Sequence, residues 1–158
     1  MSKIAPLSCT VLALLVLIIG CVGGEIAPTG TAAEIADKVF AESGVSFRMA
    51  ESLSLAEDEK KEFYLGSTEY PEFADSVVVS PMIRVDTRLL VVLKLAGRGD
   101  VETTKIKLEE NIDPRRLVCV TFKPEDVAIE SRDDVVFMTI NSDAEQRNAL
   151  LEAFRTLE

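Results

Sequence analysis

The chain has 158 residues with 27 acidic and 17 basic side chains, a formal net charge of −10 and no histidine. The acidic balance repels nucleic-acid phosphates and excludes nucleic-acid binding, and the lack of histidine excludes histidine-rich zinc sites. The content of Val, Leu, Ile and Phe is sufficient for one folded domain.

An uncharged apolar stretch of 19 residues, Ile4 to Val22, follows the single positive charge of Lys3. This order predicts that the rest of the chain is exported, because positive residues stay on the inner side. The stretch is also long enough to cross a bilayer core of roughly 30 Å, so an uncleaved anchor is an alternative to a signal peptide. The same stretch could also serve ordinary secretion or belong to the core of a cytosolic protein.

The apolar stretch ends in Ile18-Ile19-Gly20-Cys21, which resembles the lipobox of prokaryotic lipoproteins. The resemblance implies a signal peptide over 1–20, cleavage between Gly20 and Cys21, and a diacylglycerol on the Cys21 thiol. The implied partner is therefore the membrane, through a lipid on Cys21, because two or more acyl chains anchor stably. The implied location is the outer face of the cytoplasmic membrane, or the periplasm or cell surface.

Three cysteines occur: Cys9 within the predicted signal, Cys21 in the lipobox, and Cys119. With Cys9 in the signal and a lipid on Cys21, Cys119 is left without a partner, so no internal disulfide is predicted. The apolar residues around it in 117–120 favour a small buried hydrophobe. The alternative is a reactive thiol, but no histidine is present to activate it.

Residues 21–30 contain three glycines and a proline and are predicted to be a flexible tether. A single domain is predicted over 31–158. A capping box, Thr31 to Glu34, and apolar residues at helical spacing predict its first helix over about 31–43. The alternating charges of 57–66 favour a short second helix.

Two strands are predicted next. The β-branched residues of 75–80 favour a strand that ends or bulges at Pro81 and could resume over 82–85. Apolar side chains alternate onto both faces over 88–95, which is typical of a central strand that is covered on both sides.

Gly97 to Gly99 form a turn, and apolar residues at helical spacing predict a helix over 101–112. Asp113-Pro114 then resembles a helix start, whereas 117–122 has strand propensity. The pattern does not decide between the two, and helix is favoured for 115–122.

A β-hairpin is predicted from 127–130 and 135–141, and a second capping box, Ser142 to Glu145, starts a closing helix with an apolar stripe to Leu157. The predicted fold class is α+β. It comprises an antiparallel sheet of about four strands, with an N-terminal helix, a closing C-terminal helix and helices packed mainly on one face.

In the order of these features the sequence resembles a family of small prokaryotic cell-envelope lipoproteins that is classified only as a domain of unknown function. The resemblance covers about 60–158 in addition to the lipobox, and it departs where Pro114 interrupts the family's one long helix. It implies no catalytic residues. The features that carry it are the lipobox with Cys21, the acidic stretch before Tyr64, Ser80-Pro81-Met82, the strand ending at Lys94, the helix from Val101, and Pro124-Glu125.

No catalytic, metal or cofactor site is predicted, and ligand-binding residues are unknown. The pairs Glu109-Glu110, Glu125-Asp126 and Asp133-Asp134 lack the spacing and glycine of a calcium loop and are interpreted as solvated faces. Serine-hydrolase, dinucleotide and phosphate-loop motifs are absent from the sequence.

Three functional hypotheses follow. The first is a noncatalytic lipoprotein that binds an envelope protein or organises envelope components. The second is a small-ligand or cation-binding lipoprotein that serves a transporter, which requires an apolar pocket above roughly 200 Å³ with convergent polar groups. The third is a carboxylate-based hydrolase, which requires two inward-pointing acids with raised pKa values in one cleft.

Overall fold

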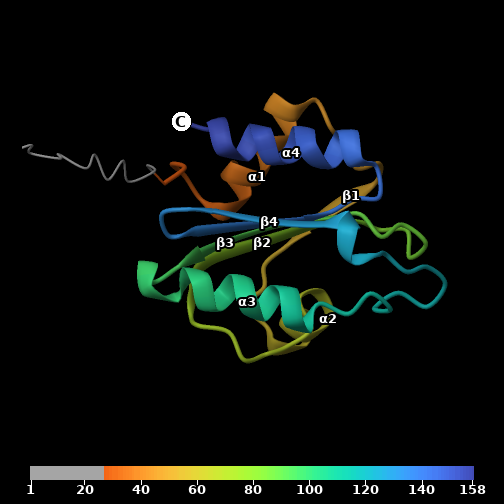
Figure 1. The fold of residues 1–158 in the computed structure, drawn as a ribbon, viewed down its shortest axis with the longest axis horizontal. Helices are drawn as coiled ribbons and strands as arrows, with labels where there is room; N and C mark the ends of the chain where they lie inside the picture. The colour runs from red at the N-terminus through yellow and green to blue at the C-terminus, as the bar shows by residue number, and fades with distance from the viewer. Residues whose placement is uncertain (1–26) are drawn as a thin grey trace, which may run out of the picture.

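The computed structural model describes residues 27–158, which form a five-stranded antiparallel sheet with four α-helices (Figure 1). The helices are α1 (Ala32–Ser43), α2 (Asp58–Leu65), α3 (Val101–Asn111) and α4 (Ala144–Thr156). The strands are β1 (Ala50–Leu53), β2 (Phe73–Pro81), β3 (Leu89–Leu95), β4 (Val127–Arg132) and β5 (Val135–Ile140). Their order across the sheet is β1-β2-β3-β5-β4, and the predicted α+β class is confirmed.

Helices cover both faces of the sheet, because its central strands bury apolar side chains on both sides (Figure 1). Leu90 and Val92 of β3 face a core closed by α1 and α4. Val91 and Leu93 face a second core closed by α2 and α3. The prediction of β3 as a doubly covered strand is therefore confirmed, and the prediction of helices mainly on one face is wrong.

The sheet has one more strand than the four predicted. Three of the four residues of β1 are exposed, so no alternation of apolar side chains marks this strand in the sequence. It is held by antiparallel pairing with β2, from Ala50 opposite Pro81 to Leu53 opposite Val78.

The predicted continuation of the strand over 82–85 is wrong. The chain turns there, with the Asp86 N–H donating to the Ile83 carbonyl oxygen (3.0 Å). Because β3 runs antiparallel to β2, the chain must reverse between them. The apolar side chains of this connection consequently face solvent.

Residues 113–122 form a loop, so neither the favoured helix nor the alternative strand is present. Asp113 Oδ1 accepts a hydrogen bond from the Arg115 N–H (2.8 Å), which closes a single turn around Pro114. The second core is already covered by α2 and α3, and Phe122 is the residue of this loop that is buried in it. The rest of the apolar run has no remaining core face to cover.

Cys119 lies on this loop and is exposed, so its predicted burial is wrong. We expect its thiol to react with N-ethylmaleimide in the folded protein at nearly the rate measured in urea, because access limits such reactions. Mass mapping of the peptide containing Cys119 over time measures both rates. Protection of about tenfold or more in the folded protein would contradict this exposure.

The two terminal helices begin at polar side chains. Thr31 and Glu34 form the predicted capping box, with Thr31 Oγ1 accepting from the Glu34 N–H (3.2 Å) and Glu34 Oε2 accepting from the Thr31 N–H (2.8 Å). At α4 the cap is Asp143 rather than the predicted Ser142. Asp143 Oδ1 accepts from two backbone N–H groups of the first turn.

Two of the acids interpreted as solvated have structural partners instead. Asp126 is buried, and its Oδ2 accepts from the Lys123 N–H (2.8 Å). Asp133 follows β4 in the hairpin turn with φ +55° and forms an ion pair with Arg98, whose Nη2 donates to Oδ2 (2.8 Å). These carboxylates fix the start and the turn of the β4–β5 hairpin.

The ordered domain begins before Thr31. The carbonyl oxygens of Thr29 and Gly30 accept from the side-chain nitrogens of Lys38 (3.1 Å) and Lys94 (2.6 Å), so part of the predicted tether contacts the domain. Gly20, Cys21 and the predicted signal peptide lie outside the described residues. None of the helices within residues 27–158 combines the length and the apolar content that a bilayer span requires.

Tyr70 joins α2 to α3 on the second face. Its hydroxyl donates to the Leu65 carbonyl oxygen (2.8 Å) and also lies 3.3 Å from that of Lys107. Burial raises the pKa of Tyr70 to about 12, with an opposing effect from Asn111. The folded state therefore favours the neutral phenol.

This shift predicts a loss of stability in alkali. Below pH 10 both states hold the proton and the stabilisation is complete, whereas between pH 10 and 12 the unfolded chain ionises first and stability falls. Two pKa units correspond to about 2.7 kcal/mol, and partial exposure of the ring reduces this to about 1 kcal/mol. Urea unfolding below pH 10 and near pH 12 should show this loss in the wild type and little of it in Tyr70→Phe. Equal losses in the two proteins would contradict the assignment.

Candidate functional site

Within residues 27–158 no three histidine, cysteine or acidic side chains gather so as to hold a metal ion. The features of this part of the chain that could bind a partner are an exposed apolar surface and the cavity within it. Both lie where α2, β1, the end of β2 and two loops meet.

Large apolar side chains are exposed together at this end of the sheet. The Met82 N–H donates to the Met49 carbonyl oxygen (2.9 Å), which joins the segment before β1 to the loop after β2. Met82 is 58% exposed, and it lines one depression together with Phe63 and Ile83, so these exposed apolar side chains are candidates for contact with a partner. We call this surface the apolar patch; its members are Met49, Phe63, Met82, Ile83 and Val85.

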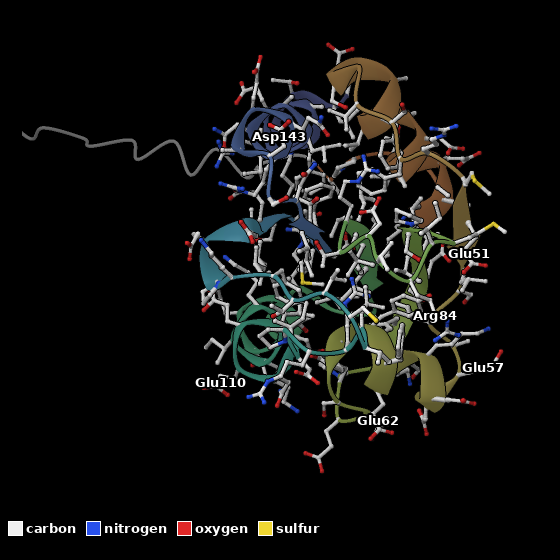
Figure 2. The ribbon with its side chains drawn as sticks, turned by 90° about the vertical axis from the view of Figure 1, so that its right-hand side faces the viewer. Glu51, Glu57, Glu62, Arg84, Glu110 and Asp143 are labelled. Atoms are coloured by element: carbon white, nitrogen blue, oxygen red, sulfur yellow. The ribbon has the colours of Figure 1, made fainter. Side chains whose placement is uncertain are left out.

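A depression of about 100 Å³ opens within the apolar patch. Its lining comes from α2, from β1 and β2, and from the loops 82–88 and 113–122. Figure 2 looks onto this end of the molecule, with Arg84 on the same side as Glu51 and Glu57. The residues that line the depression are Glu51, Phe63, Tyr64, Ser80, Pro81, Met82, Ile83, Arg84, Asp86, Arg88, Arg116 and Leu117.

Arg116 brings a cation to the depression from the loop 113–122. Its Nη2 donates to the Thr87 carbonyl oxygen (3.0 Å), but its Nε is buried without a hydrogen-bond partner among the described residues. The guanidinium carbon lies 5.9 Å from the ring centroids of both Phe63 and Tyr64. Burial lowers the pKa of Arg116 from its ordinary value, with an opposing effect from Tyr64.

Arg88, in contrast, is neutralised within the chain. Its Nε lies 3.0 Å from both carboxylate oxygens of Asp86, and its Nη2 donates to Oδ2 at 2.5 Å. These hydrogen bonds hold the pKa of Asp86 below its ordinary value. A general acid needs the opposite shift, so Asp86 does not fit the carboxylate-hydrolase hypothesis.

Further polar groups line the same depression. The hydroxyl oxygens of Tyr64 and Ser80 lie 3.4 Å apart and form a hydrogen bond. Arg84 is exposed and forms no hydrogen bond or ion pair with the other described residues. The depression thus combines hydroxyl donors, two guanidinium groups without carboxylate partners and apolar walls.

A larger cavity of about 320 Å³ lies between α3, the loop 113–122 and β4. It has the volume that the small-ligand hypothesis requires, but Glu109 is its one charged lining residue and no convergent polar groups accompany it. The other residues that line it are Ile112, Pro114, Phe122, Pro124, Val127 and Ile129.

Sequence patterns gave no indication of the depression. The exposed apolar residues after Pro81 resembled a resumed strand, and Arg116 fell within a predicted helix. The adjacent Arg115-Arg116 pair was the available signal, but nothing local distinguishes the exposed arginine from the buried one.

Comparisons of the chain with protein-family models, with curated proteins and with solved structures found no match.

Proposed function

We propose that the chain is a membrane-tethered extracytoplasmic lipoprotein that binds a protein partner through the apolar patch and performs no catalysis. The observation that carries the proposal is the position of the loop 82–88, which holds Met82, Ile83 and Val85 of the patch and lies at the end of the domain opposite its start (Figure 1).

The length of β2 gives the distance between the start of the domain and the apolar patch. Near its start, Asp75 Oδ2 accepts a hydrogen bond from the Ala32 N–H (2.7 Å), at the beginning of α1. At its end, Pro81 lines the depression. Six strand residues at about 3.3 Å each separate these points by roughly 20 Å.

This geometry favours a protein over the membrane as the partner of the patch. With a lipid on Cys21, residues 21–26 would reach at most about 20 Å, which keeps the start of the domain near the membrane. The patch would then lie roughly 20 Å farther along the domain than the tethered end. The net charge of −10 also opposes contact with an anionic lipid surface.

Crosslinking in intact membranes tests the proposal. We expect partners to be enriched with the wild-type chain, and the double substitution Met82→Asp, Ile83→Asp to reduce that enrichment about tenfold or more, as for buried anchor residues at interfaces. The matched control is Ile106→Asp, which adds a charge to an exposed apolar position on α3.

Enrichment no greater than that of an unrelated lipoprotein would contradict the interaction. Equal losses in the Met82/Ile83 variant and in Ile106→Asp would contradict the location. Intact mass in the membrane fraction tests the anchor separately, because lipidation at Cys21 requires loss of residues 1–20 and the added mass of acyl chains.

A further inference from the structure

We infer that the depression in the apolar patch binds a carboxylate of the protein partner, carried beside an aliphatic side chain, with Arg116 as the principal cation. This inference rests on the proposed function and names the chemistry that the partner presents.

Charge complementarity points to an anion. The chain carries 27 acids against 17 bases, yet three arginines line this one depression. The Arg88–Asp86 pair is internally neutral. Within the lining itself, Arg84 and Arg116 then outnumber the remaining acid, Glu51.

The hydrogen-bond inventory points to a carboxylate in particular. Arg116 Nε is a buried charged donor without a hydrogen-bond partner within residues 27–158, and leaving such a donor unsatisfied is unfavourable. A carboxylate oxygen accepts from a guanidinium in a charge-assisted bond, and its second oxygen can accept from a hydroxyl. The Tyr64 and Ser80 hydroxyls lie at the same depression.

The size of the depression favours the end of a protein segment over a free small molecule. About 100 Å³ accommodates a carboxylate and a short apolar group, whereas small-molecule sites usually occupy 300 to 1,000 Å³. Phe63, Met82 and Ile83 extend the apolar surface beyond its mouth, where a neighbouring aliphatic side chain would pack.

An NMR titration of the full-length chain in nonionic detergent, labelled with ¹⁵N-arginine, tests this inference. The probe is acetyl-Ala-Leu-Leu with a free carboxylate, compared with the same peptide as a C-terminal amide and with acetate. We expect saturable movement of the Arg116 Nε–H resonance with the acid, at a millimolar Kd, and about tenfold weaker effects with the amide and with acetate.

Three variants test whether binding depends on Arg116 itself or only on the net positive charge nearby. Arg116→Gln should weaken binding of the peptide acid about tenfold or more, measured on the backbone N–H resonances of Arg84 and Arg88. Arg115→Gln removes the same charge from the adjacent exposed position and should leave binding within about twofold. Arg116→Lys should fall between them, because a point charge replaces a planar donor.

Three results would overturn the inference. If the acid and the amide bind equally well, the depression does not recognise a carboxylate. If acetate binds as well as the peptide acid, the depression is a simple anion site and the aliphatic side chain contributes nothing. Displacement of the resonance by vesicles of phosphatidylcholine and phosphatidylglycerol, but not by the peptide acid, would assign the surface to lipid.

The experiments distinguish failure of the proposed function from failure of the carboxylate site. If crosslinking enriches a partner equally with the wild type and Arg116→Gln, the proposed function stands and the carboxylate site is wrong. If the peptide acid binds as expected and no partner is enriched, the site stands and the protein-interaction role is wrong.

Discussion

Replacing Phe137 with alanine is expected to lower the free energy of unfolding by about 4 kcal/mol, a large part of the total of a domain of this size. Phe137 is fully buried in β5, and its ring stacks on that of Phe154 from α4 with centroids 4.8 Å apart. Truncation would leave a cavity where the sheet meets both terminal helices. Neighbours on a five-stranded sheet have little freedom to fill it.

The matched control is Phe63→Ala, which removes the same atoms from a ring that is 37% exposed. It should cost about 1 kcal/mol, mainly through its edge-to-face contact with Tyr64. Urea unfolding followed by circular dichroism measures both values, since the chain has no tryptophan. Similar losses in the two variants would contradict the central place of Phe137 in the core.

Replacing Gly66 with alanine is expected to lower the free energy of unfolding by about 3 kcal/mol. Gly66 ends α2 with φ +77°, a conformation that L side chains rarely adopt. An added Cβ would also overlap the backbone carbonyl of Asn111, the last residue of α3. Two backbone segments would therefore have to separate, which no side-chain rotation can avoid.

Gly44 offers a closely matched control for this substitution. It ends α1 with φ +67°, and an added Cβ there meets no atom within 4 Å. Gly44→Ala should therefore cost about 1 kcal/mol, the conformational penalty alone. The difference between the variants, measured by urea unfolding, isolates the close approach of α2 and α3. A difference near zero would show that these helices separate easily.

The elements that could be predicted are those whose signal is local. The capping box of α1 and the alternation in β3 lie within single segments, and the structure confirms both. β1 could not be predicted, because its stability comes from pairing with β2 rather than from its own exposed side chains. The apolar run 117–122 led to the wrong prediction of a helix. Apolar residues become buried only where a core face is still uncovered, and α2 and α3 already cover this one.

The candidate site is non-local in the same sense. Tyr64 belongs to α2, Ser80 to β2 and Arg116 to a loop that follows α3. Their proximity depends on the order of the strands in the sheet and on the path of the loops 82–88 and 113–122. Neither the strand order nor the loop paths can be predicted from residue spacing. The predicted lipid site at Cys21 stays a prediction, since it lies outside the described residues.

The first and last described segments lie beside each other, with Thr29 Oγ1 3.5 Å from the Glu158 carbonyl oxygen as its hydrogen-bond acceptor. The two ends of residues 27–158 therefore lie next to each other. A domain fused after Glu158 would emerge next to the predicted tether and leave the opposite end of the molecule uncovered. A circularly permuted chain, with Glu158 linked to residue 27 and new ends in an exposed loop, should keep the same packing because the two original ends are adjacent.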